Sequence, residues 1–315
     1  MIVSTLGLEE PWRSRLDRTA GGRPVRHCAL AELTAEELEQ TEILFTYGYD
    51  VTEKALAAMP ALRWVHIGQS GMDKLPMAEL ARRGIRLTNS RGINAVAIAE
   101  YAMGMMLNVV RRSFVFYEQA RAGVWDLETR LDEVCGKTLG IFGLGRVGRE
   151  LAARAHAFGM QVLGVDLAPG TAPGVQAVYA PAQQLEVLAR CDFVVICMPL
   201  TGETRHLFGE KELAAMKPTA WLMNVGRGPI VDEAALTRAL EAGQLGGAAL
   251  DVFETEPLPA GSPLWGMKNV YITPHIAGDH QASYMPRMMG VLCENLALYP
   301  AFERMENPVD PGRGF

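Results

Sequence analysis

The chain has 315 residues, of which 49% are hydrophobic, and a formal net charge of −6 at pH 7. This length allows two domains with sizeable cores. The acidic balance, with no block of basic residues, argues against nucleic acid as a partner, and no apolar run reaches the roughly 20 residues of a membrane helix. The five cysteines are scattered and have no metal-ligand spacing, which is typical of reduced thiols. We therefore expect a cytoplasmic protein without a metal site.

The first ninety residues alternate short apolar runs with segments of helix-forming composition. The runs predict strands at 2–6, 25–28, 43–46, 64–67 and 86–88, and the segments predict helices at 34–39, 52–58 and 76–82. A longer helix is expected over 95–112. Alternation of this kind favours a parallel α/β sheet.

A glycine motif follows in the middle of the chain. An apolar run leads into Gly143-Leu-Gly145-Arg-Val-Gly148, which has the G-x-G-x-x-G spacing, and a helical segment comes next. In a dinucleotide site the first glycine permits a tight turn, the second lets the backbone approach a pyrophosphate, and the third lets the helix pack on the strand. The pyrophosphate would lie at the helix N-terminus, where free N–H groups favour an anion.

An acidic residue completes this unit. A second apolar run over 161–165 ends at Asp166, close to the ~20-residue distance at which a carboxylate accepts hydrogen bonds from a ribose. A carboxylate there repels a 2′-phosphate, and no arginine follows it directly. The sequence therefore predicts NAD as the cofactor and weaker binding of NADP.

The later apolar runs predict strands at 193–197, 221–225, 248–252 and 270–273. Polar residues occur at the ends of the last three of these runs. They lie in Asn224-Val-Gly-Arg227-Gly, Asp251-Val-Phe-Glu-Thr-Glu256-Pro-Leu-Pro and Thr273-Pro-His275-Ile-Ala-Gly. Ligands bind at the carboxyl ends of strands in open α/β sheets, so we expect these side chains to meet there. A last helix is predicted over 281–298.

In this order the motifs resemble those of the D-isomer-specific 2-hydroxyacid dehydrogenases, in particular the glyoxylate/hydroxypyruvate reductases. The resemblance implies two doubly wound parallel-sheet α/β domains, with a central Rossmann NAD-binding domain inserted into a flavodoxin-like substrate domain. We expect the substrate domain at 1–92 and 277–315 and the NAD-binding domain at 93–276. The family also implies a homodimer formed through the NAD-binding domains.

The same resemblance makes Arg227, Glu256 and His275 the catalytic residues. Reduction of a 2-keto acid needs a proton on the carbonyl oxygen, and histidine is a common donor near neutral pH. Glu256 would hydrogen-bond the imidazole and fix its tautomer. Arg227 would hold the substrate carboxylate or carbonyl with its planar fork of donors.

The other site residues implied by the family fall into two groups. The substrate residues are Ser70, Gly71, Met72, Asn94 and Arg227. The cofactor residues are Gly143, Gly145, Arg146, Val147, Gly148, Asp166, Met198, Pro199, Thr204, Val225, Asp251 and Gly278. An alternative interpretation of Asn94 is that it is the N-cap of a helix.

The sequence narrows the substrate without naming it. The loop Thr46-Tyr-Gly-Tyr-Asp50 has no lysine or arginine, which disfavours a phosphoglycerate enzyme, although Arg91 or a partner subunit is a possible source of a cation. Glu256 disfavours the formate dehydrogenase branch of the family, and phosphite dehydrogenase stays an alternative. We expect an NAD-dependent oxidoreductase that interconverts a small 2-keto acid and the D-2-hydroxy acid. The alternative hypothesis is that the protein is an NAD(H)-sensing corepressor of the same fold.

Overall fold

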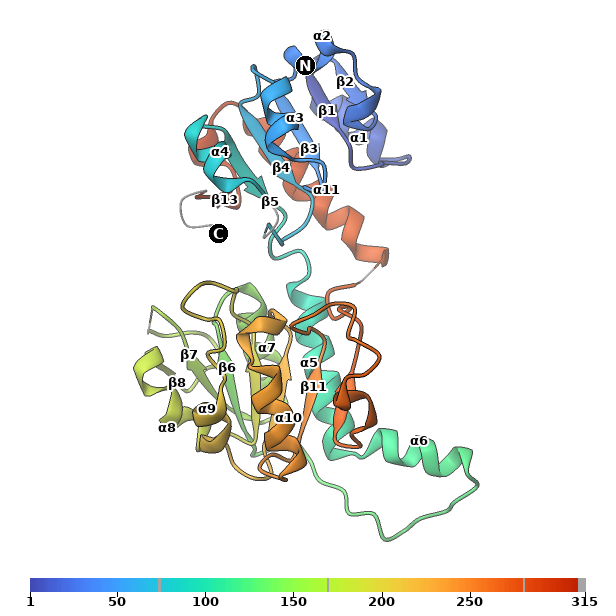
Figure 1. Ribbon diagram of the computed structural model, residues 1–315, viewed down its shortest axis with the longest axis vertical. Coiled ribbons are helices and arrows are strands. Elements are labelled where there is room, and N and C mark those ends of the chain that lie inside the picture. Colours follow the sequence, from blue (N-terminus) through green and yellow to red (C-terminus); the bar gives the residue numbers. More distant parts are fainter. Residues whose placement is uncertain (73–74, 169, 280, 311–315) are drawn as a thin grey trace. The chain divides into compact units, whose positions relative to one another are not determined.

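The computed structural model describes residues 1–72, 75–168, 170–279 and 281–310. It divides into two compact units, Met1–Ile93 with His280–Phe315, and Asn94–Asp279, so the second unit interrupts the first (Figure 1). The boundaries expected from the sequence, after residues 92 and 276, lie close to these breaks.

The first unit is built on a sheet of order β13-β5-β4-β3-β1-β2, in which β13 is antiparallel and the other pairings are parallel. Its strands are β1 (Ile2–Ser4), β2 (Val25–His27), β3 (Ile43–Thr46), β4 (Trp64–Ile67), β5 (Arg86–Asn89) and β13 (Pro308–Val309). Its α-helices are α1 (Trp12–Thr19), α2 (Ala35–Glu39), α3 (Glu53–Ala58), α4 (Met77–Arg82) and α11 (Gln281–Leu298). The order of the parallel strands is that of a flavodoxin-like sheet, as predicted.

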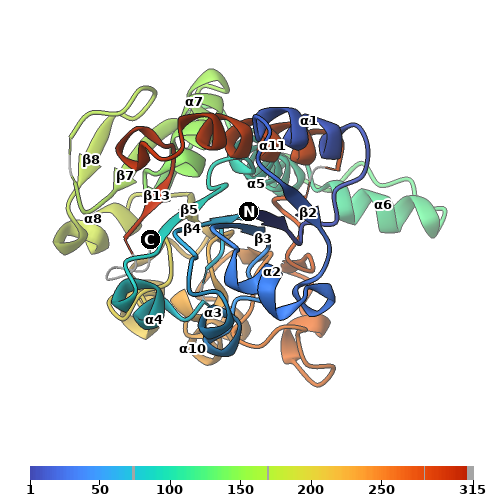
Figure 2. The ribbon, with the colours of Figure 1, turned by 90° about the horizontal axis from the view of Figure 1, so that it is seen from above.

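Helices cover both faces of this sheet (Figure 2). On one face α1 and α11 bury Leu16 and Met288 against Phe45 and Trp64. On the other face α3 and α4 bury residues such as Leu56 against the opposite side chains of the same strands. Because both faces are covered, the strands read as continuous apolar runs and not as alternating patterns.

The second unit is a seven-stranded parallel sheet of order β12-β11-β10-β9-β6-β7-β8. Its strands are β6 (Thr138–Phe142), β7 (Gln161–Val165), β8 (Ala177–Tyr179), β9 (Phe193–Ile196), β10 (Trp221–Asn224), β11 (Gly247–Leu250) and β12 (Val270–Ile272). Its α-helices are α5 (Ala95–Val110), α6 (Ser113–Arg121), α7 (Arg146–Ala157), α8 (Gln184–Leu188), α9 (Glu210–Ala215) and α10 (Glu233–Glu241). The strand order reverses beside β6, which is the Rossmann arrangement.

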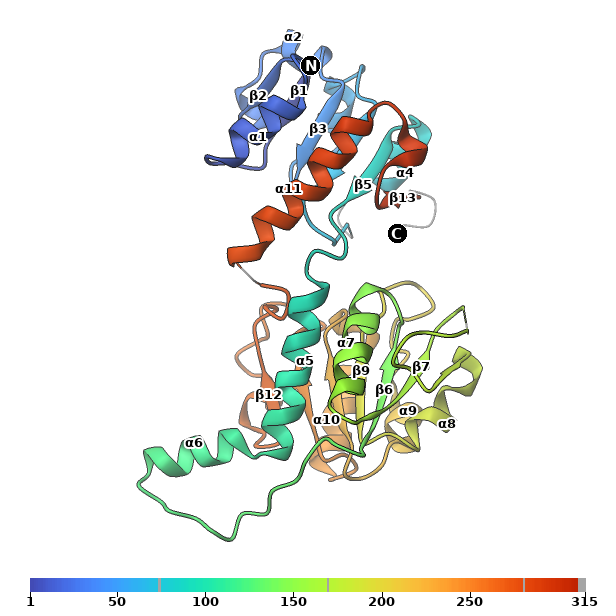
Figure 3. The same ribbon diagram turned by 180° about the vertical axis from the view of Figure 1, so that it is seen from behind.

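Two apolar clusters cover the faces of this second sheet. Figure 3 shows α5 and α7 over one face, where Met103, Met106 and Leu151 are buried. Residues of α8, α9 and α10, among them Leu213 and Leu236, are buried on the other face. The glycine motif therefore begins at the central strand of a fully covered sheet.

The helix expected over 95–112 ends earlier than the sequence suggests. Arg112 adopts φ 54°, a left-handed conformation that interrupts the chain between α5 and α6. The strand β8 was not predicted from the sequence, because its three residues are only half-buried at the edge of the sheet. Among the described residues, no helix is both long and apolar enough to cross a bilayer.

Candidate functional site

The glycine motif forms the turn from β6 into α7. Gly143 has φ 98°, and a Cβ atom there would lie 3.0 Å from the backbone nitrogen of Met198. A Cβ on Gly148 would lie 2.1 Å from the carbonyl oxygen of Gly143, so only glycine lets the helix approach the strand this closely. A Cβ on Gly145 would meet no protein atom within 4 Å, so packing within the protein does not explain that glycine. Open space at Gly145, beside the start of α7, fits the approach of a pyrophosphate.

Asp166 follows β7 and lies beside the glycine turn. Its Oδ2 accepts a hydrogen bond from the backbone N–H of Leu144 at 2.7 Å, and its Oδ1 accepts from Ala168 at 3.1 Å. Arg149 donates from Nε to the carbonyl oxygen of Leu144 at 2.9 Å. The carboxylate is half-buried and joins the two loops that would hold the two halves of a dinucleotide. Arg146 is exposed at the first turn of α7, and Val147 is half-buried beside it.

The remaining cofactor candidates lie in the loops after β9 and β10. The Thr204 hydroxyl donates to the carbonyl oxygen of Pro199 at 2.8 Å and accepts from the backbone N–H of Thr201 at 2.7 Å, which closes this loop on itself. Met198 contacts the glycine turn at Gly143, as described above. Val225 is half-buried and donates its N–H to β9. These residues line the same edge of the sheet as the glycine motif.

Arg227 lies in the turn after β10, which Asn224 shapes. The buried Asn224 side chain donates from Nδ2 to the carbonyl oxygen of Arg227 at 2.9 Å, and its Oδ1 accepts from the N–H of Gly226 at 3.0 Å. A Cβ on Gly228 would lie 1.9 Å from the backbone of Phe253, so this turn packs directly against the segment that leads to Glu256. Arg227 itself is half-buried, and its Nη1 donates to the carbonyl oxygen of Gly226 at 2.9 Å.

Glu256 and His275 meet as the sequence predicts. Glu256 Oε2 lies 2.8 Å from His275 Nδ1, and its Oε1 accepts from the backbone N–H of Phe253 at 3.0 Å. The side chains of His275 and Glu256 are 49% and 37% exposed, respectively. With Nδ1 engaged by the carboxylate, the Nε2 atom is the ring nitrogen available to a substrate.

Asp251 lies beneath the turn that carries His275. Its carboxylate is 2% exposed and accepts from the Thr273 hydroxyl and from the backbone N–H groups of Ile276 and Ala277. Asp251, which the sequence analysis places among the cofactor residues, therefore also holds the turn that carries His275. Thr273 is a further residue of this site that was not predicted from the sequence, although it directly precedes Pro274 and His275 in the motif.

Asn94 and Gly278 lie next to each other, because a Cβ on Gly278 would be 3.0 Å from Asn94 Nδ2. Asn94 occupies the N-cap position of α5, but its side chain makes no capping hydrogen bond. The capping interpretation therefore does not account for this asparagine. Its proximity to Gly278 links it to the turn of His275.

Ser70, Gly71 and Met72 belong to the first unit and follow β4. The carbonyl oxygen of Gly68 accepts from the Tyr284 hydroxyl at 2.7 Å, and that of Ser70 accepts from Asn89 Nδ2 at 3.1 Å. These bonds direct the carbonyl groups of the loop into the unit. Such an arrangement suits a loop whose N–H groups bind a carboxylate.

The loop after β3 has no cationic side chain. Thr46 bonds the Asp50 carboxylate, and Gln69 Nε2 donates to the carbonyl oxygen of Tyr47 at 2.8 Å. Burial raises the pKa of Tyr47, whereas Tyr49 is 74% exposed. Arg91 is exposed after β5, and its backbone is held by Asn89 and Asn307.

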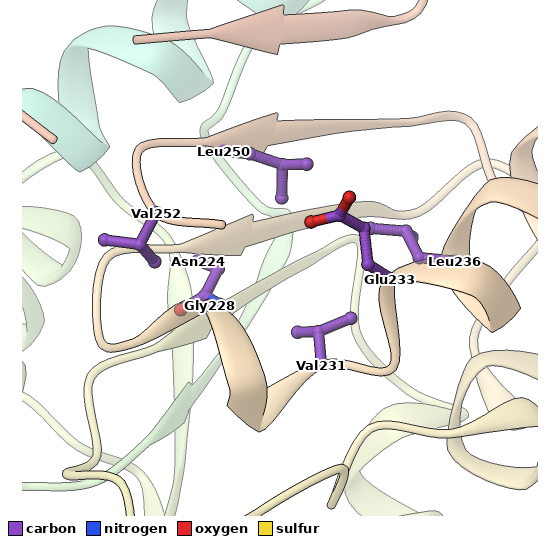
Figure 4. A pocket seen from close by; sticks show the side chains of 7 residues that line it. All are labelled: Asn224, Gly228, Val231, Glu233, Leu236, Leu250 and Val252. Atoms are coloured by element: carbon purple, nitrogen blue, oxygen red, sulfur yellow. The ribbon is translucent and has the colours of Figure 1, made fainter. Parts of the chain in front are cut away.

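A small pocket lies behind the candidate catalytic loops of the second unit (Figure 4). It is lined by Asn224, Gly228, Val231, Glu233, Leu236, Leu250 and Val252. Its interior is about as large as one water molecule, so it does not accommodate a dinucleotide or a keto acid. Burial raises the pKa of Glu233, whose carboxylate accepts from the N–H of Glu254 at 3.2 Å. This pocket belongs to the packing of α10 against the loop of Glu256.

No group of three or more metal-ligating side chains occurs in the described part of the chain. The candidate site described above consists of the histidine–glutamate pair, the arginine and the two glycine-containing loops.

Comparison with known proteins identifies the family. The family model for the D-isomer specific 2-hydroxyacid dehydrogenase, NAD binding domain, matches residues 103–277. Glyoxylate/hydroxypyruvate reductase B of Yersinia pestis (strain Pestoides F) is 37% identical over 280 residues, which cover 87% of this chain and 85% of the relative.

Two solved structures have the same fold over nearly their whole length. A D-isomer specific 2-hydroxyacid dehydrogenase family protein from Aeromonas salmonicida subsp. salmonicida A449 superposes with a TM-score of 0.86 at 32% identity, covering 98% of this chain and 99% of that chain. A D-isomer specific 2-hydroxyacid dehydrogenase from Xanthobacter autotrophicus Py2, in complex with NADPH and MES, has a TM-score of 0.84 at 30% identity, covering 100% and 99%. The chain therefore belongs to the D-isomer specific 2-hydroxyacid dehydrogenase family and is an NAD-dependent oxidoreductase of small 2-hydroxy and 2-keto acids.

Proposed function

We propose that the protein reduces glyoxylate, hydroxypyruvate or a similarly small 2-keto acid to the D-2-hydroxy acid. The observation that carries this proposal is the pair of His275 Nδ1 and Glu256 Oε2, 2.8 Å apart, beside the turn of Arg227. In this fold the nicotinamide supplies the hydride when the cofactor is bound. The residues of the chain supply the proton and hold the substrate.

His275 is the general acid in this proposal. The carboxylate of Glu256 accepts from Nδ1–H, which sets the tautomer and orients the ring. In the imidazolium form Nε2–H donates its proton to the carbonyl oxygen of the substrate as C2 receives the hydride. In the oxidative direction neutral Nε2 takes the hydroxyl proton, so the same pair serves both directions.

Arg227 of the second unit is proposed to hold the substrate, and Ser70, Gly71 and Met72 are proposed as substrate residues of the first unit. A guanidinium offers two parallel N–H donors to a carboxylate or to a carboxylate and its neighbouring carbonyl. The carbonyl oxygens of Gly68 and Ser70 accept hydrogen bonds from other residues of the first unit. We therefore expect N–H groups of the loop to face the substrate carboxylate. Asn94 is a further substrate contact in this proposal, because it lies beside Gly278 in the segment that follows His275.

We also propose that NADH is preferred to NADPH. The support is Asp166, each of whose carboxylate oxygens accepts one backbone N–H and retains a lone pair that would accept a ribose hydroxyl. The glycine turn with Met198, Pro199, Thr204 and Val225 would hold the rest of the cofactor. The Xanthobacter relative was solved with NADPH, and titration of this protein with both cofactors tests the proposed preference.

The substrate proposal rests on two supports. The loop from Thr46 to Asp50 offers tyrosines and a carboxylate where a phosphate would need cations, and a curated relative is named a glyoxylate/hydroxypyruvate reductase. The test is the rate of NADH oxidation with glyoxylate, hydroxypyruvate, pyruvate and 3-phosphohydroxypyruvate. The small acids should exceed the phosphorylated one in kcat/KM at least about tenfold, because each charge-assisted phosphate contact is worth about 1.5–3 kcal/mol. NADH binding without turnover of any keto acid would point to a binding protein instead.

A cytoplasmic homodimer is the proposed assembly. Its support is an apolar surface on α6 and the segment after it, which projects from the rest of the second unit (Figure 3). Tyr117, Trp125 and Leu127 on this surface are 59%, 90% and 82% exposed. The cytoplasmic part of this proposal is supported by the scattered spacing of the five cysteines in the sequence. Light scattering of the wild type and of Trp125→Glu tests the dimer, because a charge in an apolar interface should lower the molar mass.

A further inference from the structure

His275 has a backbone conformation that a side chain rarely adopts. Its φ is 57°, in the left-handed region, although it is not a glycine. Such a conformation persists only where surrounding interactions hold it. The interactions that hold this residue are therefore part of what presents its ring to the substrate.

The carboxylate of Asp251 holds the turn on both sides of the strained residue. Its Oδ1 accepts from the N–H of Ile276 at 2.9 Å, and its Oδ2 accepts from the N–H of Ala277 at 2.9 Å. The backbone carbonyl of Asp251 also accepts from the N–H of His275 at 2.8 Å. The turn is therefore fixed by one buried residue at the end of β11.

Two hydroxyl groups connect this carboxylate to α5. Thr273 Oγ1 donates to Asp251 Oδ1 at 2.6 Å, and Tyr101 OH lies 2.7 Å from the same Thr273 oxygen. A threonine hydroxyl has one hydrogen, which Asp251 receives, so Tyr101 must be the donor to Thr273. Burial raises the pKa of Tyr101 to about 12, so its phenol remains a donor at neutral pH.

We propose that Tyr101 and Thr273 are positioning residues for the reaction, which fix Asp251 and thereby hold His275 in its left-handed conformation. This inference rests on the proposed role of His275. The hydroxyl groups donate hydrogen bonds in one direction, from Tyr101 to Thr273 and from Thr273 to Asp251. These bonds anchor the catalytic turn to α5, which packs on the opposite face of the sheet from α10. Neither hydroxyl touches the substrate in this scheme.

The test compares Thr273→Val, Thr273→Ser, Tyr101→Phe and His275→Ala in the full-length protein. Thr273→Val keeps the shape of the side chain and removes the hydroxyl, so kcat should fall about 10- to 100-fold, as expected for a misplaced catalytic group. KM for the keto acid and the dissociation constant for NADH should change much less. Thr273→Ser retains the hydroxyl and should restore most of kcat, and Tyr101→Phe should lower kcat in the same direction as Thr273→Val.

Hydrogen exchange of the peptide that contains residues 273–279 provides a readout that does not depend on turnover. Exchange of the Ile276 and Ala277 amides should be faster in Thr273→Val and Tyr101→Phe and near wild type in Thr273→Ser. Wild-type kcat and exchange in Thr273→Val would overturn the positioning role, as would equal losses in Thr273→Val and Thr273→Ser. If His275→Ala keeps kcat while exchange still responds to Thr273→Val, the role of His275 in the proposed function is what fails.

Discussion

His275 Nδ1 and Glu256 Oε2 lie 2.8 Å apart, although 19 positions separate the two residues in the sequence. The pair joins the turn after β12 to the loop after β11, and it leaves about half of the histidine side chain exposed. An imidazole oriented from one side and open on the other is suited to exchange a proton with a bound substrate.

Replacing His275 tests this role directly. His275→Ala should lower kcat for keto acid reduction about 10²- to 10⁴-fold, the usual contribution of a general acid, while NADH binding stays unchanged. Steady-state kinetics and fluorescence titration of NADH measure the two effects. His156→Ala, at an exposed position of α7, is the matched control and should behave as the wild type. A His275→Ala enzyme with wild-type kcat would refute the assignment.

Substitutions of Arg227 test whether the reaction requires only a positive charge or also the planar pair of donors of the guanidinium. Arg227→Ala should raise KM and lower kcat, because the guanidinium is expected to hold the substrate before and during the reaction. Arg227→Lys should recover only part of the loss, since an ammonium group lacks the planar pair of donors. Arg238→Lys, in an exposed ion pair with Glu210, is the control for a general effect of this exchange. Full recovery by lysine would mean that charge alone is required.

The cofactor preference should depend on Asp166. Wild-type protein should bind NADH more tightly than NADPH, and Asp166→Ala should narrow the difference by about tenfold, because charge-assisted hydrogen bonds to the ribose are lost and repulsion of the 2′-phosphate is relieved. Fluorescence titrations of both cofactors measure this ratio. Glu186→Ala, on the surface of α8, should leave it unchanged. Equal affinity of the wild type for both cofactors would contradict the role of Asp166.

Gly145 and Gly148 should respond differently to substitution by alanine, because Gly145 is exposed and Gly148 is buried. Gly145→Ala introduces a Cβ that meets no protein atom, so the thermal midpoint should change little while NADH binding weakens. Gly148→Ala places a Cβ 2.1 Å from the Gly143 carbonyl oxygen, so it should destabilise the fold itself. Thermal unfolding with and without NADH distinguishes them. Unimpaired NADH binding in Gly145→Ala would show that no ligand approaches this position.

Buried His66 should make the stability of the first unit depend on pH. Burial lowers the pKa of His66 to about 3, whereas in the unfolded chain it is near the ordinary value of 6.5. Below pH 6.5 the unfolded state therefore binds a proton that the folded state does not, so the free energy of unfolding falls as the pH falls. Between pH 7 and pH 5 this contribution amounts to about 2 kcal/mol.

Denaturant unfolding at both pH values, followed by tryptophan fluorescence, measures this loss. His66 Nδ1 and Nε2 lie 2.8 and 3.1 Å from the Thr88 and Ser90 hydroxyls, so His66→Gln should be less stable at pH 7 but should lose less on acidification. An identical loss in both proteins would assign the pH dependence to other groups.

Much of the architecture could be predicted from local sequence. The apolar runs that became β3, β4 and β9 lie in sheets covered on both faces, and such strands carry continuous apolar sequence. Gly143 and Gly148 were recognisable because their steric requirements leave no other residue type. Arg227, Glu256 and His275 were proposed because their motifs resemble those of the family, and the structure adds the contact between His275 and Glu256. The break at Arg112 and the edge strand β8 depend on weak local preferences that the surrounding packing decides.

What the tertiary structure alone decided is how distant residues hold these groups. The sequence carries no sign that Tyr101 reaches Thr273 across 172 positions, that Leu144 donates to Asp166, or that Asn224 shapes the turn of Arg227. Local patterns arise from the periods of helices and strands, which a chain expresses residue by residue. Hydrogen bonds between distant side chains depend on which strands become neighbours and on a few tenths of an ångström in their packing, so they exist only in the folded molecule.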